Sequence, residues 1–117
     1  MPIEQLELRK GYNNGLIEAT LNRRDSDGNL EAFDLTGATI TVQIYDYDRA
    51  TVLASFDGTV VTASSGIFSA IPSSSDLNAL TNGLTYPYGI LVQNATYTDG
   101  LVFTEDENYN QLECIVY

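Results

Sequence analysis

The chain has 117 residues, among them 16 acidic and five basic side chains, no histidine and one cysteine, and its formal net charge is -11. A protein this acidic repels phosphate backbones and anionic lipid surfaces, so we expect no nucleic acid and no membrane among its partners, whereas a basic protein surface fits. The length predicts one domain, a single β-sandwich over residues 1–117. No apolar run reaches the roughly 18 residues of a membrane span, and the first residues lack a signal-peptide pattern, which favours synthesis in the cytoplasm.

The first third of the chain predicts short strands separated by turns. Residues 3–8 and 16–24 alternate as strands do, and the Asn14-Gly15 dipeptide between them is a strong turn signal. Turn-forming residues then follow from Asp25 to Asn29, and residues 30–35 form a short extended return. We therefore expect a hairpin around Asp25–Asn29.

Residues 38–45 contain the longest clean alternation in the chain and predict its central strand. Asp34 to Gly37 form a turn before this strand, because Asp bonds its own backbone and Gly tolerates a positive φ. Aliphatic residues then alternate with polar residues as far as Tyr45, which is typical of a half-buried strand. We expect Tyr45 and Tyr47 to project from opposite faces of this strand or of its exit.

The second half repeats the pattern of short strands and turns. Asp57-Gly58 and Asp99-Gly100 are predicted as hairpin turns, and Pro72 ends a strand because it has no amide donor. The one expected helix covers residues 73–80. The strands predicted in this half cover residues 51–56, 59–62, 67–71, 84–94, 101–104 and 112–116.

Short strands with a turn signal every eight to twelve residues predict an all-β fold, an immunoglobulin-like antiparallel β-sandwich with one short helix. Cys114 is interpreted as a small buried hydrophobe, because no histidine exists to activate it as a nucleophile. The predicted core consists of Ile17, Leu21, Ile40, Val42, Ile44, Phe56, Tyr88, Ile90, Val92, Leu112, Cys114 and Val116.

The residue inventory leaves little room for enzyme chemistry. Without histidine the chain lacks Ser-His-Asp and Cys-His nucleophile systems and most zinc sites, and it has no Gly-rich phosphate loop. Paired carboxylates could still build a glycosidase, but the acidic residues are scattered over turns and give this no specific support. We therefore predict no enzyme, no catalytic residues, no cofactor and no metal.

Asp25, Asp27 and Asn29 have the spacing of the first three calcium ligands in a calcium-binding loop. Gly28, however, occupies the fourth position instead of the sixth, and Thr36 occupies the twelfth, where a bidentate Glu is expected. We interpret this segment as a hairpin turn, and residues 46–48 and 105–107 as solvated acidic loops.

Four short motifs follow one another within the first 40 residues. They are Leu8-Arg9-Lys10-Gly11, Ala19-Thr20-Leu21, Asp25-Ser26-Asp27-Gly28-Asn29 and Asp34-Leu35-Thr36-Gly37-Ala38-Thr39-Ile40. With residues 86–92, the Asp99-Gly100 turn and a closing strand, this order resembles the N-terminal immunoglobulin-like domain of phage baseplate upper proteins, over nearly the whole chain. The resemblance implies a structural protein of a tailed-phage virion that is made in the cytoplasm of the bacterial host.

In that family a further module, which holds a receptor-binding protein, follows the domain, whereas this sequence ends after its last predicted strand. Two structural roles are therefore expected, a capsid decoration protein or a baseplate or tail adaptor, with the major capsid protein or a tail or baseplate protein as partner. Because virion accessory proteins occupy symmetry axes, we expect a homotrimer, with a hexamer as the alternative.

Tyrosines and outward-facing apolar side chains are the predicted contact residues, since tyrosine offers a large area and a polar tip. The interface candidates are Tyr45, Tyr47, Leu53, Val61 and Phe68. Tyrosines also line sugar-binding platforms, so the alternative function is a carbohydrate-binding module of a viral or bacterial surface protein.

Overall fold

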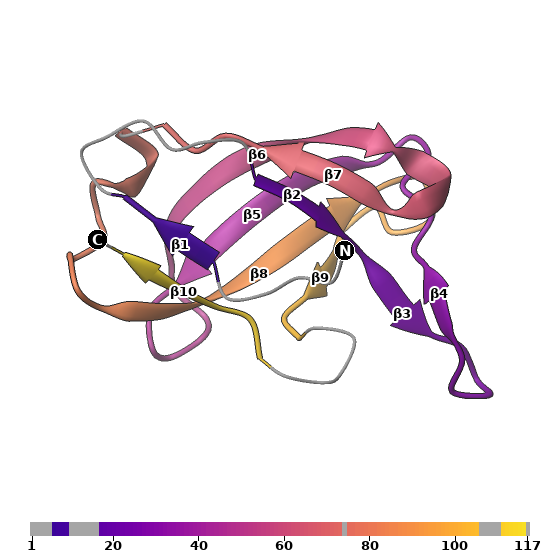
Figure 1. Cartoon of the computed structure of the whole chain (residues 1–117), viewed down its shortest axis with the longest axis horizontal. Helices are drawn as coiled ribbons and strands as arrows, with labels where there is room; N and C mark the ends of the chain where they lie inside the picture. Colours follow the sequence, from indigo (N-terminus) through magenta and orange to yellow (C-terminus); the bar gives the residue numbers. More distant parts are fainter. Residues whose placement is uncertain (1–5, 10–16, 74, 106–110, 117) are drawn as a thin grey trace.

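The computed structural model describes residues 6–9, 17–73, 75–105 and 111–116, and in these ranges the chain is almost entirely strand and turn (Figure 1). The predicted all-β, sandwich-like fold is confirmed. The strands are β1 (Leu6–Leu8), β2 (Ile17–Thr20), β3 (Asn22–Arg24), β4 (Leu30–Ala32), β5 (Thr39–Tyr45), β6 (Val52–Thr62), β7 (Ile67–Ala70), β8 (Thr85–Gln93), β9 (Leu101–Phe103) and β10 (Glu113–Val116).

One strongly curled sheet carries most of these strands, in the order β1-β10-β8-β5-β6-β7-β2, with β9 also paired to β8. All pairings within it are antiparallel except the one between β1 and β10. The β3–β4 hairpin forms a separate two-stranded sheet that projects from one end of the molecule (Figure 1). The turn predicted at Asp25–Asn29 closes this hairpin.

The predicted central strand is β5, which pairs with β6 on one side and β8 on the other. Val42 lies opposite Phe56 on β6 and Ile90 on β8, and all three side chains are buried. The turn expected before this strand is present, with Gly37 at a φ of 69° and the Asp34 carboxylate bonded to Thr36. The alternation of residues 38–45 therefore gave the correct inner face.

The turn predicted at Asp57-Gly58 is wrong, because β6 continues through both residues as one 11-residue strand. Gly58 instead allows a close approach between strands. A Cβ atom there would lie 3.0 Å from Ile40 Cγ2 and 3.2 Å from Phe68 Cδ2. The absence of a side chain at this position lets β5, β6 and β7 approach one another closely, which is a role that glycine has inside strands.

The helix expected over residues 73–80 is a single 3₁₀ turn, η2 (Ser75–Leu77); a second 3₁₀ turn, η1 (Ala63–Ser65), precedes β7. Two hydrogen bonds between Ser73 and Asp76 hold the start of η2, as in a capping box. The backbone N–H of each residue donates to the side chain of the other. Leu77 and Leu80 are both buried, which anchors this segment to the core.

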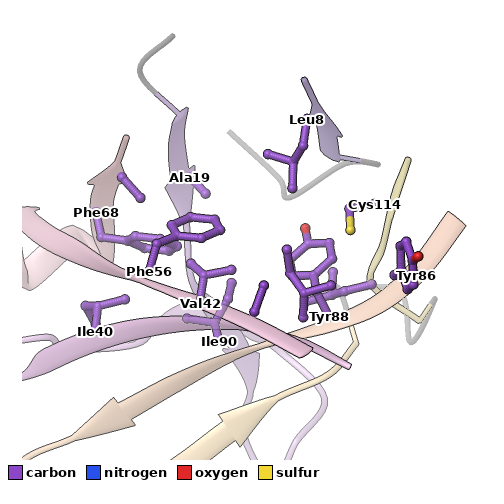
Figure 2. Close-up of a cluster of buried hydrophobic side chains, with 14 of the residues drawn as sticks. Leu8, Ala19, Ile40, Val42, Phe56, Phe68, Tyr86, Tyr88, Ile90 and Cys114 are labelled. Carbon is purple, nitrogen blue, oxygen red and sulfur yellow. The ribbon is translucent and has the colours of Figure 1, made fainter. Parts of the chain in front are cut away.

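The curvature of the sheet brings its two outermost strands over a common core, where Leu8 of β1 and Ala19 of β2 face the side chains of β5, β6 and β8 (Figure 2). Of the predicted core residues, Ile17 is only partly buried and the others are buried. Leu84 begins the predicted strand 84–94, where alternation with Tyr88 and Ile90 puts it on the inner face, but it lies before β8 and is 39% exposed. Tyr86, expected on the inner face with Tyr88, is buried, and the buried hydrophobic residues that the sequence did not place in the core include Leu8, Phe33, Leu35, Phe68, Leu77 and Leu80.

Some predicted features lie outside the described residues. These are the first part of the strand at residues 3–8, the Asn14-Gly15 turn, residue 74 in the helix, and residues 106 and 107 of the second acidic loop.

Candidate functional site

Tyr45 is buried on the outer face of the sheet, and so it is not the exposed contact residue that was expected. Only 8% of its surface is exposed. Its ring lies over Gly89 of β8 beside Val102 of β9, and its Oη donates a hydrogen bond to Gln43 Oε1 at 2.9 Å. Burial raises the pKa of the Tyr45 hydroxyl above its ordinary value, so this group stays neutral well above neutral pH.

Tyr47 is the aromatic side chain that fits the predicted contact role. It is 62% exposed, yet its ring stacks on the buried ring of Tyr86 with centroids 5.9 Å apart and an interplanar angle of 14°. Tyr86 is itself fixed, because its Oη accepts a hydrogen bond from the backbone N–H of Thr81 at 2.8 Å. Tyr47 is therefore both exposed and restrained.

The β5–β6 turn that carries Tyr47 is held by its own carboxylates. Asp48 Oδ1 accepts hydrogen bonds from the backbone N–H groups of Ala50 and Thr51, and its Oδ2 accepts one from Thr51 Oγ1. These bonds lower the pKa of the Asp48 carboxyl, the side-chain bond from Thr51 most of all. The expectation of a solvated acidic loop at residues 46–48 is confirmed, but the loop is ordered by hydrogen bonds.

Phe68 was expected to face outward, and this is wrong: its side chain is 2% exposed and belongs to the core. It pairs with Val60 across the β6–β7 hairpin, and the continuous β6 fixes which face each residue takes. Leu53 is half-buried and packs against the core. Neither side chain offers the free apolar surface that was predicted.

Val61 is 54% exposed, in agreement with the prediction, and lies where the β6–β7 register shifts. It cannot share a compact patch with Tyr47. Val52, which follows the Tyr47 turn, and Val61 lie near opposite ends of β6, roughly 30 Å apart at about 3.3 Å per residue. In the described part of the chain, the exposed large hydrophobic residues are Leu30, Tyr47, Val52, Val61, Ile71, Leu84 and Val102.

A groove that the sequence did not reveal lies between the β3–β4 hairpin and the loop after β8. Its volume is about 430 Å³, and it is lined by Arg23, Glu31, Ala32, Phe33, Asp34, Thr36, Asn94, Thr96 and Tyr97. The lining comes from two segments, residues 23–36 and 94–97, that are far apart in the sequence. No local motif could have joined them.

Two aromatic rings, those of Phe33 and Tyr97, line this groove. Phe33 packs edge-on against Phe103 with centroids 5.1 Å apart, and Tyr97 lies 6.2 Å from Phe33 at an angle of 36°. The Arg23 guanidinium lies over the Phe33 ring, 5.7 Å from its centroid. Arg23 is exposed, but this cation–π contact restrains its guanidinium beside the groove.

Turn-closing hydrogen bonds fix the two rims of the groove. Asp34 Oδ1 accepts bonds from the backbone N–H and the Oγ1 of Thr36, which lower the pKa of the Asp34 carboxyl. Asn94 Oδ1 accepts bonds from the backbone N–H groups of Thr96 and Tyr97 at 2.9 and 2.8 Å. Both rims are thus preorganised by side chains that also line the groove.

The calcium-like segment is a hairpin turn, as predicted. Asp25 Oδ1 accepts hydrogen bonds from the backbone N–H groups of Asp27 and Asn29. Over the described ranges, no three His, Cys, Asp or Glu side chains are grouped so that they could hold one metal ion.

Cys114 is fully buried and reduced, as the sequence predicted. Burial raises the pKa of its thiol to about 12, and the neighbouring Glu113 carboxylate acts in the same direction. A thiol with such a pKa is protonated at neutral pH and packs as a small hydrophobic side chain.

No protein-family model and no curated protein sequence matches this chain. Where the structure describes the chain, no helix has the length and hydropathy needed to cross a membrane.

Proposed function

We propose that this protein is a non-enzymatic structural component of a tailed-bacteriophage particle that acts by protein–protein contact, as a capsid decoration protein or a baseplate or tail adaptor. The sequence resemblance to the N-terminal domain of baseplate upper proteins supports this role. The all-β fold agrees with the fold that the resemblance implies.

One structural observation carries the contact function, the stack of Tyr47 on Tyr86. An exposed tyrosine that is already restrained loses little side-chain entropy when a partner covers it, and tyrosine is among the residues enriched in binding hot spots. The negative charge of the chain suits a partner with a basic surface. These features fit a small subunit that docks on a larger assembly.

The test is to locate the chain in purified phage particles by cryo-electron microscopy. The expected result is one all-β density of about 41 × 26 × 24 Å per symmetry-related position on the head, neck or baseplate, with the Tyr47 end against a neighbouring virion protein. Particles that assemble without this chain and never contain it would overturn the proposal.

A matched pair of variants tests the role of Tyr47. Tyr47→Ser should reduce incorporation into particles, whereas Val61→Ser removes an exposed apolar side chain at the other end of β6 and should leave incorporation unchanged. Equal incorporation of both variants would show that Tyr47 does not carry the contact.

A further inference from the structure

The groove beneath the β3–β4 hairpin has a chemical character that the proposed structural role does not use. Arg23 of β3 lies directly opposite Glu31 of β4 in the hairpin register, and both side chains line the groove. Within the described ranges, neither the Arg23 guanidinium nor the Glu31 carboxylate has an ion pair or a hydrogen bond to another side chain. Donors and acceptors are therefore available side by side.

The rims supply further free hydrogen-bonding capacity. Asn94 uses its Oδ1 to close its own turn, and among the residues that the structure describes its two Nδ2 hydrogens have no partner. Asp34 likewise uses Oδ1 for Thr36 and keeps Oδ2. Because these turns fix the side chains in advance, a ligand would meet oriented groups and would not have to order them.

The charges of the groove narrow the kind of ligand that it fits. The lining carries two carboxylates, Glu31 and the ionised Asp34, and one cation, Arg23, so a charged ligand of either sign meets at least one like charge. A neutral ligand whose groups both donate and accept hydrogen bonds avoids both conflicts. Hydroxyl groups have this property, and a ring with several hydroxyls fits a lining that contains Arg, Asn, Asp and Glu side chains.

The aromatic rings in the lining agree with such a ligand. Tyr97 is half-buried and lines the groove, and its ring lies 6.2 Å from the ring of the buried Phe33, which also lines it. An aromatic ring offers the apolar surface that the C–H face of a sugar ring requires. The volume of about 430 Å³ lies within the range of roughly 300–1,000 Å³ for small-molecule sites.

From these observations we infer that the groove between the β3–β4 hairpin and residues 94–97 is a binding site for a neutral saccharide. The inference does not depend on a place in a virion, because every residue that it uses belongs to this chain. The site also differs from the exposed tyrosines that the sequence suggested, since Tyr47 lies outside it.

The test is a titration of the ¹⁵N-labelled protein, followed by amide chemical shifts. The probes are methyl glycosides of glucose, galactose, mannose, N-acetylglucosamine and rhamnose, with N-acetylneuraminic acid as an anionic probe and glucosamine as a cationic probe. Saturable shifts of Arg23, Phe33 and Tyr97 with at least one neutral glycoside are expected. Absence of saturable shifts for all five, or tighter binding of either charged probe, would overturn the inference.

Variants then assign the binding to the groove. Arg23→Met keeps an apolar stem over Phe33 but removes the guanidinium, and Asn94→Asp keeps the turn-closing oxygen but removes both Nδ2 donors. Each should weaken binding by about tenfold or more, the usual cost of a lost hydrogen bond that involves a charged group or leaves a buried partner unpaired.

Arg24→Met is the matched control, since Arg24 is the next residue on β3, carries the same charge and does not line the groove. It should leave the affinity unchanged. Equal weakening by Arg24→Met and Arg23→Met would show that net charge, and not this site, controls binding. Amide spectra of each variant establish that it is folded, and Asn94→Asp remains a test if Arg23→Met does not fold.

Discussion

Tyr45 and Gly89 lie on neighbouring strands, and the absence of a side chain at Gly89 makes room for the Tyr45 ring. A Cβ atom at Gly89 would lie 2.9 Å from Tyr45 Oη and 3.0 Å from Tyr45 Cε2. The backbone of Gly89 is not in the left-handed region, so this glycine is required for space. The outer face of β8 is buried at this point because Tyr45 covers it.

Gly89→Ala should therefore destabilise the protein by about 1–3 kcal/mol, the usual cost of an added group in a packed site. Urea denaturation measures this change. In a Tyr45→Ala background the cost should be smaller, because the ring that the new methyl group meets is gone. A cost that is identical in both backgrounds would show that Tyr45 does not restrict position 89.

Gly66 and Gly28 form a second test, since both have a positive φ but only Gly66 is enclosed. Gly28 has a φ of 83° and nothing within 4 Å of a Cβ atom, whereas a Cβ atom at Gly66 would collide with the carbonyl oxygen of Leu21. Gly28→Ala should cost about 1–2 kcal/mol from backbone conformation alone. Gly66→Ala should cost about 2 kcal/mol more, as measured by urea denaturation. Equal costs would contradict the contact with Leu21.

The buried thiol of Cys114 predicts a loss of stability in alkaline solution. Its pKa is raised from 9.0 to about 12 on folding, so above pH 9 the unfolded chain releases a proton that the folded chain keeps. The contribution is complete below pH 9 and is lost as pH rises toward 12. Denaturation midpoints across this range measure it. Cys114→Val should reduce the change of the denaturation midpoint with pH in this range. An unchanged pH dependence would show that another group is responsible.

The same burial predicts slow reaction of Cys114 with a thiol reagent in the native state and fast reaction in denaturant. Rapid labelling of the native protein would show that β10 is not packed as described.

Asp48 predicts a loss of stability in acid. Hydrogen bonds from Thr51 and Ala50 lower the pKa of its carboxyl below 3.8, so the stabilisation is present above that pH and disappears as pH falls through the lowered value. Asp48→Asn should reduce the difference between denaturation midpoints at neutral and acidic pH. Asp57→Asn on β6 is the control, because it changes the same charge at an exposed strand position. A larger effect of the control would contradict the role of the turn.

Self-association is predicted to tighten with salt. The charge of -11 makes subunits repel one another, and added salt screens this repulsion. Light scattering should show a homotrimer, or a hexamer as the alternative, that strengthens between low and high salt and weakens in Tyr47→Ser. A strict monomer at high concentration and high salt would rule out the closed ring.

The parts of the fold that could be predicted from sequence are those where one face of a strand is buried. Val42 lies between the polar residues Thr41 and Gln43, so its face follows from period two alone. Asp57-Gly58 could not be resolved in this way, because the dipeptide that favours a hairpin turn also suits a strand interior that needs close approach. The wrongly predicted turn at Gly58 also led to the wrong face for Phe68. Phe68 pairs with Val60, which belongs to the part of β6 that continues past Gly58.

The candidate sites were harder to predict from the sequence, because they depend on contacts between segments that are far apart along the chain. The burial of Tyr45 depends on a glycine in another strand, and the groove joins Arg23 to Asn94 through folding alone. Tyr47 could be identified as a contact candidate because tyrosine is common at interfaces, where it offers a large area and a polar tip. Its stack on Tyr86 depends on tertiary structure and has no local signal.

The parallel pairing of β1 with β10 also has a consequence for the order of folding. Leu6 pairs with Cys114 and Leu8 with Val116, so this contact closes almost the entire chain into one loop, whereas β5, β6 and β7 join neighbours in sequence. Closing a long loop costs more chain entropy than forming a hairpin, so β1 should dock late. Until it does, one edge of β10 lacks its partner. The rate at which Cys114 becomes inaccessible during refolding should therefore report the final step of assembly and not the collapse of the central strands.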